Sequence, residues 1–174
     1  MVGCYHQVLN LVITCCLLLP VDSADAVTKN ANIAVTATLL PTCTAGTIVN
    51  TNSFGTLNFG STVALTRAIA VAGQASNGAI SIQCSKGTTF HVLLNGGQSG
   101  STASRYLAGG PSGQHVNYNL YTDAAHSQIW DNLTGVSQVA SGHVVVIPVY
   151  GLVFAQPTPA VGTYTDTVQV TVNW

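Results

Sequence analysis

The spacing of apolar residues after position 32 constrains the fold more than any other feature of this sequence. Apolar and polar residues alternate there with a period of two rather than 3.6, and Gly, Asn, Ser and Pro interrupt the alternation about every ten residues. The alternation is clearest in residues 33–39, 79–84, 90–94, 116–122 and 162–174. A period of two places alternate side chains on one face of a β-strand, so the sequence predicts an all-β fold.

The number of these segments indicates how the strands are arranged. About seven short strands follow one another without a helical pattern, and Asn77-Gly78 is a strong signal for a β-hairpin. We therefore expect an immunoglobulin-like two-sheet sandwich, with a closed barrel as the alternative. The alternation runs up to Trp174, and we expect no further strand after it.

Three other segments lead to specific expectations. Residues 96–115 include Gly109-Gly110-Pro111 and show no alternation, so we expect a long loop or an irregular edge there that is mobile. Residues 144–149 form an apolar run typical of a strand covered on both faces, in which Pro148 indicates a bulge or an edge. Further candidate core residues are Val63, Leu65, Ile69 and Val71.

The first 26 residues have the features of a secretion signal. An apolar run at residues 8–19 ends at Pro20, and Ala24-x-Ala26 fits a signal-peptidase site. The run is shorter than the roughly 20 residues that span a bilayer. We therefore expect a cleaved signal peptide over residues 1–26 and no membrane span after cleavage; the alternative is a buried N-terminal helix of a cytosolic protein.

The cysteines of the exported chain allow one disulfide. Three of the five cysteines fall within residues 1–26, which leaves Cys43 and Cys84 for the remaining chain. In an oxidising compartment these two are expected to form a disulfide. A metal site is the weaker alternative, because two thiolates without a nearby histidine pair do not complete a set of ligands.

Charge and polar residues argue against several functions. Charged residues make up 5% of the chain, Glu is absent and the formal net charge is -1, so nothing attracts nucleic acid. The five histidines lack metal-ligand spacing, and Ser99 lacks the glycine pattern of a nucleophile elbow. We expect neither catalytic residues nor a metal or other cofactor. A neutral, hydroxyl-rich surface suits a protein that packs against copies of itself.

The segment at residues 33–39 is unusual for a first strand. No charged residue occurs between Lys29 and Arg67, whereas natural edge strands are usually protected by charge or proline. The segment is either the first strand of a complete sandwich or a donor strand that completes the sheet of a neighbouring subunit.

Several motifs follow one another in a specific order. They are Cys43, Phe54-Gly55-x-Leu57-x-Phe59-Gly60, Cys84, Tyr118 through Ala125, Trp130, Val149-Tyr150-Gly151 and Gly162 through Val172. In this order they resemble the spore coat protein U domain, which is shared by Csu-type archaic chaperone-usher pilus subunits. The resemblance covers nearly all of the chain after the signal peptide.

The resemblance implies a fold and a function. Subunits of that family resemble an immunoglobulin fold without its last strand; a periplasmic chaperone lends a strand, and at the outer-membrane usher the N-terminal segment of the neighbouring subunit replaces it. The chain would then be a surface pilus subunit that supports adhesion and biofilm formation. By this resemblance, residues 27–42 are the donor-strand segment and residues 43–174 the pilin-type domain. The side chains inserted into the neighbour would be Ile33, Val35, Ala37 and Leu39.

A different class of function stays open. The same fold could be a self-complete secreted coat protein, or a carbohydrate-binding module, that exchanges no strand. Such a protein would be a stable monomer, whereas a pilus subunit would depend on a chaperone.

Overall fold

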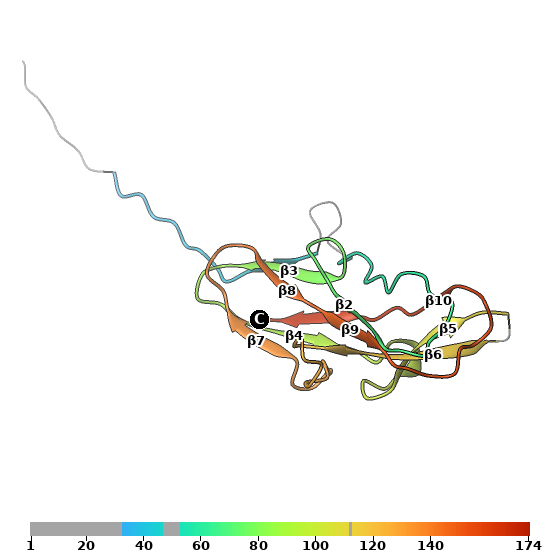
Figure 1. Cartoon of the computed structure of the whole chain (residues 1–174). Helices are drawn as coiled ribbons and strands as arrows, with labels where there is room; N and C mark the ends of the chain where they lie inside the picture. The colour runs from blue at the N-terminus through green and yellow to red at the C-terminus, as the bar shows by residue number, and fades with distance from the viewer. Residues whose placement is uncertain (1–32, 47–52, 112) are drawn as a thin grey trace, which may run out of the picture. The chain divides into compact units, whose positions relative to one another are not determined.

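The computed structural model describes residues 33–46, 53–111 and 113–174 (Figure 1). The chain divides into two units, Met1–Thr38 and Leu39–Trp174. The predicted signal peptide lies outside the described residues.

The predicted first strand is not a strand of this chain. Residues 33–42 form neither helix nor strand, and the side chains of Ile33, Val35 and Leu39 are 88%, 90% and 95% exposed. An extended segment needs a partner strand to satisfy its backbone N–H and C=O groups. Among the described residues, residues 33–39 pair with no strand, whereas Thr42 bonds to Ser85 at the start of the sandwich.

The described part of the second unit holds eleven β-strands and one 3-10 helix, η1 (Gly97–Ser99). The strands are β1 (Cys43–Ala45), β2 (Ile69–Ala72), β3 (Ala79–Cys84), β4 (Thr89–Leu94), β5 (Arg105–Gly109), β6 (Gln114–Tyr121), β7 (Val136–Val139), β8 (Val145–Pro148), β9 (Tyr150–Val153), β10 (Tyr164–Thr165) and β11 (Val170–Asn173). Within the described ranges, no helix is long and apolar enough to cross a membrane.

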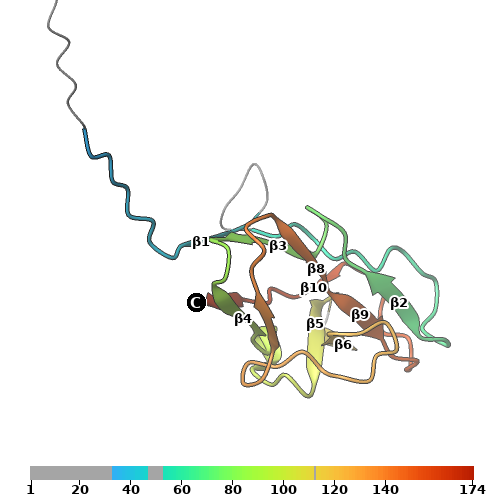
Figure 2. The same ribbon diagram turned by 90° about the vertical axis from the view of Figure 1, so that its left-hand side faces the viewer.

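The strands hydrogen bond into three antiparallel sheets. Their orders are β1-β3-β8, β10-β5-β6-β9-β2 and β11-β4-β7. In Figures 1 and 2, β3 and β8 lie in one layer and β4 in the facing layer. The predicted all-β sandwich is therefore confirmed, with three hydrogen-bonded sheets in place of two.

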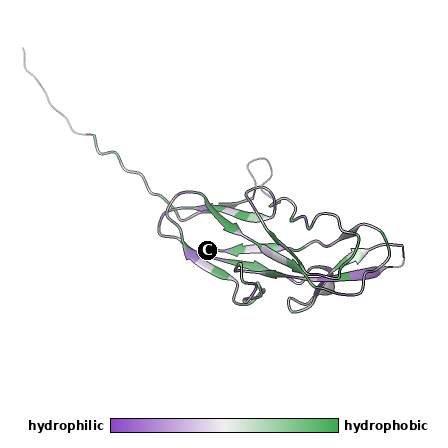
Figure 3. Ribbon diagram, viewed as in Figure 1, coloured by the Kyte–Doolittle hydropathy of each residue, from purple (hydrophilic) through white to green (hydrophobic). Residues whose placement is uncertain are grey.

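The core lies between these layers, and Figure 3 shows hydrophobic residues along the strands that enclose it. Alternate residues of β4 are buried, as the period of two predicts. Trp130 is fully buried, and its indole N–H donates to the carbonyl oxygen of Val92 over 2.9 Å. The largest fully buried side chains are Trp130, Arg105, Phe90, Ile80, Ile82, Leu94, Val92, Val153 and Asn119.

The prediction of a long loop over residues 96–115 is wrong. The segment contains η1 and β5, and β5 pairs with β6 along its whole length. Arg105 begins β5 and is fully buried, so a charged residue stands where an apolar residue would have indicated a strand. Its guanidinium donates to the carbonyl oxygens of Asn95 and Trp130 at 2.7 and 2.8 Å and to Asn119 Oδ1 at 2.7 Å. These bonds replace the hydration that burial removes.

The structure differs from two further predictions, one for the apolar run at residues 144–149 and one for Val63. Val144 and Val146 are exposed, so the apolar run is not covered on both faces. Pro148 lies on an edge strand, as predicted, because β8 pairs only with β3. Leu65 is buried, but Val63 is 99% exposed and lies in no strand.

Candidate functional site

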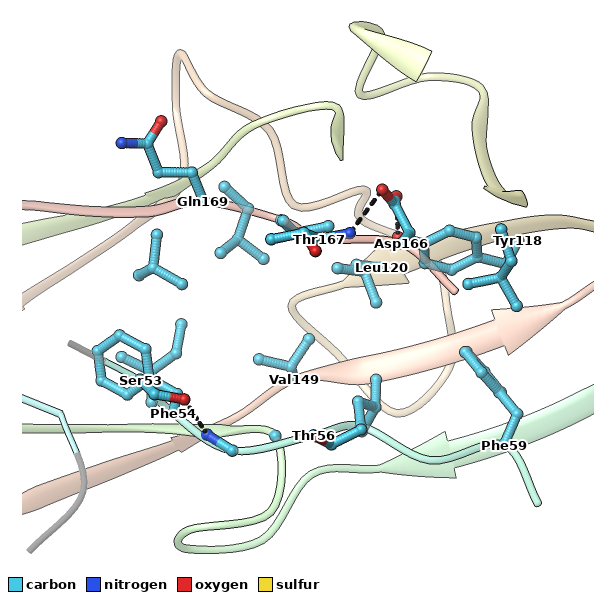
Figure 4. A pocket seen from close by; sticks show the side chains of 18 of the residues that line it. Ser53, Phe54, Thr56, Phe59, Tyr118, Leu120, Val149, Asp166, Thr167 and Gln169 are labelled. Carbon is cyan, nitrogen blue, oxygen red and sulfur yellow. Dashed lines mark hydrogen bonds between the residues drawn. The ribbon is translucent and has the colours of Figure 1, made fainter. Parts of the chain in front are cut away.

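A long apolar groove with a volume of about 780 Å³ is the main concave feature among the described residues. Its apolar lining consists of Ala45, Phe54, Leu57, Phe59, Ile80, Leu94, Leu107, Tyr118, Leu120, Val149, Val168, Val170 and Val172. Figure 4 shows Asp166 beside Tyr118 on one wall and Phe54, Thr56 and Phe59 on the facing wall. We refer to this feature as the apolar groove.

One wall of the apolar groove is the edge strand β11. Val170 and Val172 pair with Leu94 and Val92 of β4, whose side chains are buried. Cross-strand partners point to the same face of a sheet, so both valines point toward the core. They are nevertheless only half-buried. In the part of the chain that the structure describes, β11 pairs with β4 alone, so its other edge is free.

The facing wall combines β1 with residues 54–59. β1 is also an edge strand, since within the described ranges it pairs only with β3. Residues 54–59 form no strand but follow the interior closely, and the ring of Phe59 packs edge-to-face on Tyr118 at 5.9 Å. A Cβ atom on Gly151 would come within 2.8 Å of Leu57 and Phe59. A side chain at position 151 would therefore have to displace the side chains of Leu57 and Phe59 from this wall.

The turn before β3 also shapes this wall. Gly78 has φ +81, a left-handed conformation that glycine adopts without strain, and its N–H donates to the carbonyl oxygen of Phe54 at 2.9 Å. A Cβ atom there would lie 2.8 Å from Cβ of Leu57. The hairpin expected at Asn77-Gly78 does not form between neighbouring strands: the turn residues are Ala75 and Ser76, β2 pairs with β9, and β3 pairs with β1 and β8. The bond from Gly78 to Phe54 nevertheless holds this part of the wall in place.

Asp166 makes one end of the apolar groove polar. Its carboxylate accepts hydrogen bonds from the Tyr118 hydroxyl at 2.7 Å, from the Gln98 N–H at 2.8 Å and from the Thr167 N–H at 2.7 Å. Burial raises the pKa of Tyr118, and the hydrogen bond to Asp166 raises it further, so the phenol remains a donor. Asp166 therefore ties η1, β6 and the approach to β11 together.

This geometry suits binding rather than bond-breaking chemistry. A groove with an apolar interior and free strand edges on both walls matches an extended segment that carries apolar side chains at every second position. The backbone edges would supply hydrogen bonds, and the interior would bury the alternate side chains. No group of three or more His, Cys, Asp or Glu residues that could hold a metal ion occurs in the described ranges.

The predicted disulfide is confirmed. Cys43 and Cys84 lie directly opposite each other in the pairing of β1 with β3 and are joined by a disulfide. Beyond it, the Ser85 N–H donates to the carbonyl oxygen of Thr42 at 2.9 Å. Together these bonds fix the point at which residues 33–42 join the sandwich.

The donor role that the sequence predicts for residues 33–39 stays a prediction. The predicted donor residues Ile33, Val35 and Leu39 are exposed, as is the smaller Ala37. The residues of the apolar groove were not predicted, although two of its stretches belong to motifs that the sequence analysis singled out. These are residues 54–59 and 162–172. Their apolar residues looked like core positions, because the sequence does not show that the core is open along β11.

The fold and the groove define a class: all-β sandwich domains with an open apolar groove between two edge strands. The chain belongs to the Spore Coat Protein U domain family, whose model matches residues 29–171. It is 32% identical over 167 residues to "Protein U" of Myxococcus xanthus, covering 90% of this chain and 91% of that protein.

A weaker similarity is to one solved structure. It is a chain of the CsuC-CsuE chaperone-tip adhesion subunit pre-assembly complex from archaic chaperone-usher Csu pili of Acinetobacter baumannii. The identity is 18% and the TM-score 0.49, over 79% of this chain and 41% of that chain. The match therefore spans less than half the length of that chain.

Proposed function

We propose that the protein is a structural subunit of a surface pilus that a periplasmic chaperone and an outer-membrane usher assemble by donor-strand exchange. In this proposal the apolar groove of one subunit binds residues 33–39 of the next. The observation that carries the proposal is that one chain holds both an open apolar groove between free strand edges and an exposed, uncharged, alternating segment. Membership of the Spore Coat Protein U domain family supports it.

The segment and the groove match in pattern. Ile33, Val35, Ala37 and Leu39 would face the groove interior, and the threonines between them would face solvent. Seven residues of strand extend about 23 Å at the usual rise per residue. Ala37 is the smallest of the four side chains, so its position contributes least to the buried area.

The exposed groove explains why a chaperone is needed before assembly. Free strand edges next to an apolar interior promote pairing with other chains. A chaperone strand that covers the groove during export would prevent this pairing. Transit through the periplasm, display at the cell surface and roles in adhesion and biofilm formation belong to the same proposal.

Two variants at neighbouring positions test the proposal. Val35→Asp places a charge on the face that enters the groove, whereas Thr36→Asp places the same charge on the opposite face. In cells with the cognate chaperone and usher, Val35→Asp and the deletion of residues 27–40 should abolish fibres, and Thr36→Asp should keep them. Fibres that persist without residues 27–40 would refute the proposal.

A self-complete coat protein is the second candidate, because the core is largely closed without any partner. Phe90, Val92 and Trp130 are fully buried within this chain alone. If the second candidate is correct, the chain exported without a chaperone is a stable monomer that unfolds cooperatively. A pilus subunit exported in the same way would aggregate instead.

A further inference from the structure

Trp174 follows β11 directly, and its side chain is 61% exposed. Asn173 is the last residue of β11 and pairs with His91, so the next position comes opposite Phe90. Phe90 is fully buried on the face of β4 that points toward the core. The alternation that aims Val170 and Val172 into the apolar groove therefore places Trp174 on the same face, just beyond the valines that line the groove.

The position of this tryptophan differs from that of the other one in the chain. The sequence holds two tryptophans, and Trp130 is fully buried with its indole N–H bonded to Val92. Trp130 is part of the core and has no surface left to offer a partner. Trp174 presents most of a large aromatic side chain to solvent beside a free strand edge.

We propose that Trp174 is an anchor for the strand that docks in the apolar groove, and that this strand is residues 33–39 of a second copy of the chain. The inference rests on the proposed function. A strand hydrogen-bonded to the free edge of β11 has side chains that lie beside those of β11 on the inner face. Its aliphatic side chains then cover the indole, and tryptophan is among the residues that most often dominate the energy of an interface.

Residues 33–39 of a second copy have the properties that a strand bound in the apolar groove needs. Residues 33–39 are uncharged and carry Ile, Val, Ala and Leu on one face. Ile33, Val35 and Leu39 are almost fully exposed, so their apolar surface is free to be buried in the groove of another copy. An aliphatic strand can pack against an indole face without leaving a polar group unpaired.

A peptide titration tests the inference, because Trp174 is itself a spectroscopic probe. A fluorescein-labelled peptide with the sequence of residues 27–42 is present while the chain is refolded from urea at low concentration, so that docking competes with aggregation. Anisotropy of the label reports binding. Because Trp130 is already buried, a shift of tryptophan emission to shorter wavelength, measured with unlabelled peptide, reports burial of Trp174.

The expected result is binding together with the emission shift. Trp174→Ala should weaken binding by about tenfold or more, whereas Trp174→Phe should keep most of it. Leu133→Ala is the matched control, since Leu133 is an exposed apolar residue outside the strands, in the segment before β7, and it should leave binding unchanged. Binding without the shift, at equal strength in Trp174→Ala, would overturn the role of Trp174 and leave the groove proposal intact. Absence of binding would overturn both.

Discussion

Tyr118 donates its hydroxyl hydrogen to Asp166 over 2.7 Å at the polar end of the apolar groove. Tyr118 is buried on β6, and Asp166 precedes β11 by four residues. The bond links the five-stranded sheet to the segment that leads into the edge strand of the groove. It therefore helps to hold the groove open in the shape that a docking strand needs.

Removing this bond should destabilise the sandwich. Tyr118→Phe deletes the donor and leaves Asp166 with only backbone N–H groups. Hydrogen bonds to charged groups contribute about 1.5–3 kcal/mol, and a loss in this range is expected in the free energy of unfolding measured with urea. Tyr106→Phe is the control, because its hydroxyl makes only a long, exposed contact of 3.4 Å, and it should change stability by less than about 0.5 kcal/mol. Equal losses in both variants would contradict the account.

The same tyrosine predicts a dependence of stability on alkaline pH. Burial raises the pKa of Tyr118 above the ordinary value of 10.0, and the bond to Asp166 raises it further. The folded protein keeps the proton at a pH where the unfolded chain releases it. The contribution of Tyr118 to stability is thus complete below pH 10 and declines as the pH rises above it.

Urea titrations between pH 8 and pH 11 measure this decline, and Tyr118→Phe should reduce its slope. The ultraviolet absorbance of tyrosinate provides a second readout, in which one tyrosine ionises only on unfolding. An unchanged slope in Tyr118→Phe would show that the phenol titrates alike in both states.

The disulfide should account for a large share of the stability. Cys43 and Cys84 are 41 residues apart in sequence, and closing a loop of that length contributes roughly 4 kcal/mol in the chain-entropy model. The double variant Cys43→Ala, Cys84→Ala should lose about this amount, measured by urea unfolding. A reducing agent should lower the stability of the parent protein and leave the variant unaffected. Equal unfolding midpoints for the two proteins would contradict this prediction.

Arg105 should be among the least replaceable residues. Burial lowers the pKa of its guanidinium, which nevertheless stays charged and satisfies the carbonyl oxygens of Asn95 and Trp130. Arg105→Ala leaves these buried acceptors without donors and creates a cavity, so a loss of more than about 3 kcal/mol is expected in urea unfolding. The exposed Arg67→Ala is the control and should change stability by less than about 0.5 kcal/mol. A small effect of Arg105→Ala would show that water replaces the guanidinium.

Much of the fold could be predicted from alternation and turn residues. The strands at residues 79–84 and 89–94 were expected nearly as observed. Apolar residues alternate in both strands, and Gly78 directly precedes the strand at residues 79–84. The strand at residues 105–109 was missed for a physical reason. A buried arginine that is satisfied by backbone carbonyls gives the same local pattern as an exposed arginine.

The candidate site could be predicted only in part. The apolar segment at residues 33–39 stands out because it lacks charge, which is a local property of the sequence. The groove depends on which strands lack a neighbour, and this property arises only when distant strands pair. Val170 and Val172 look like ordinary core residues until the structure shows that none of the residues it describes pairs with the outer edge of β11.

Cysteine cross-linking between two variants tests the central claim most directly. Val35→Cys is introduced into one copy of the chain and Val170→Cys into another, and both are assembled together with the chaperone and the usher. The account predicts a disulfide-linked pair of chains in the fibres, and a much weaker link when Thr36→Cys replaces Val35→Cys. Fibres that form without any link from Ile33, Val35 or Leu39 to β11 of a neighbouring chain would contradict the account.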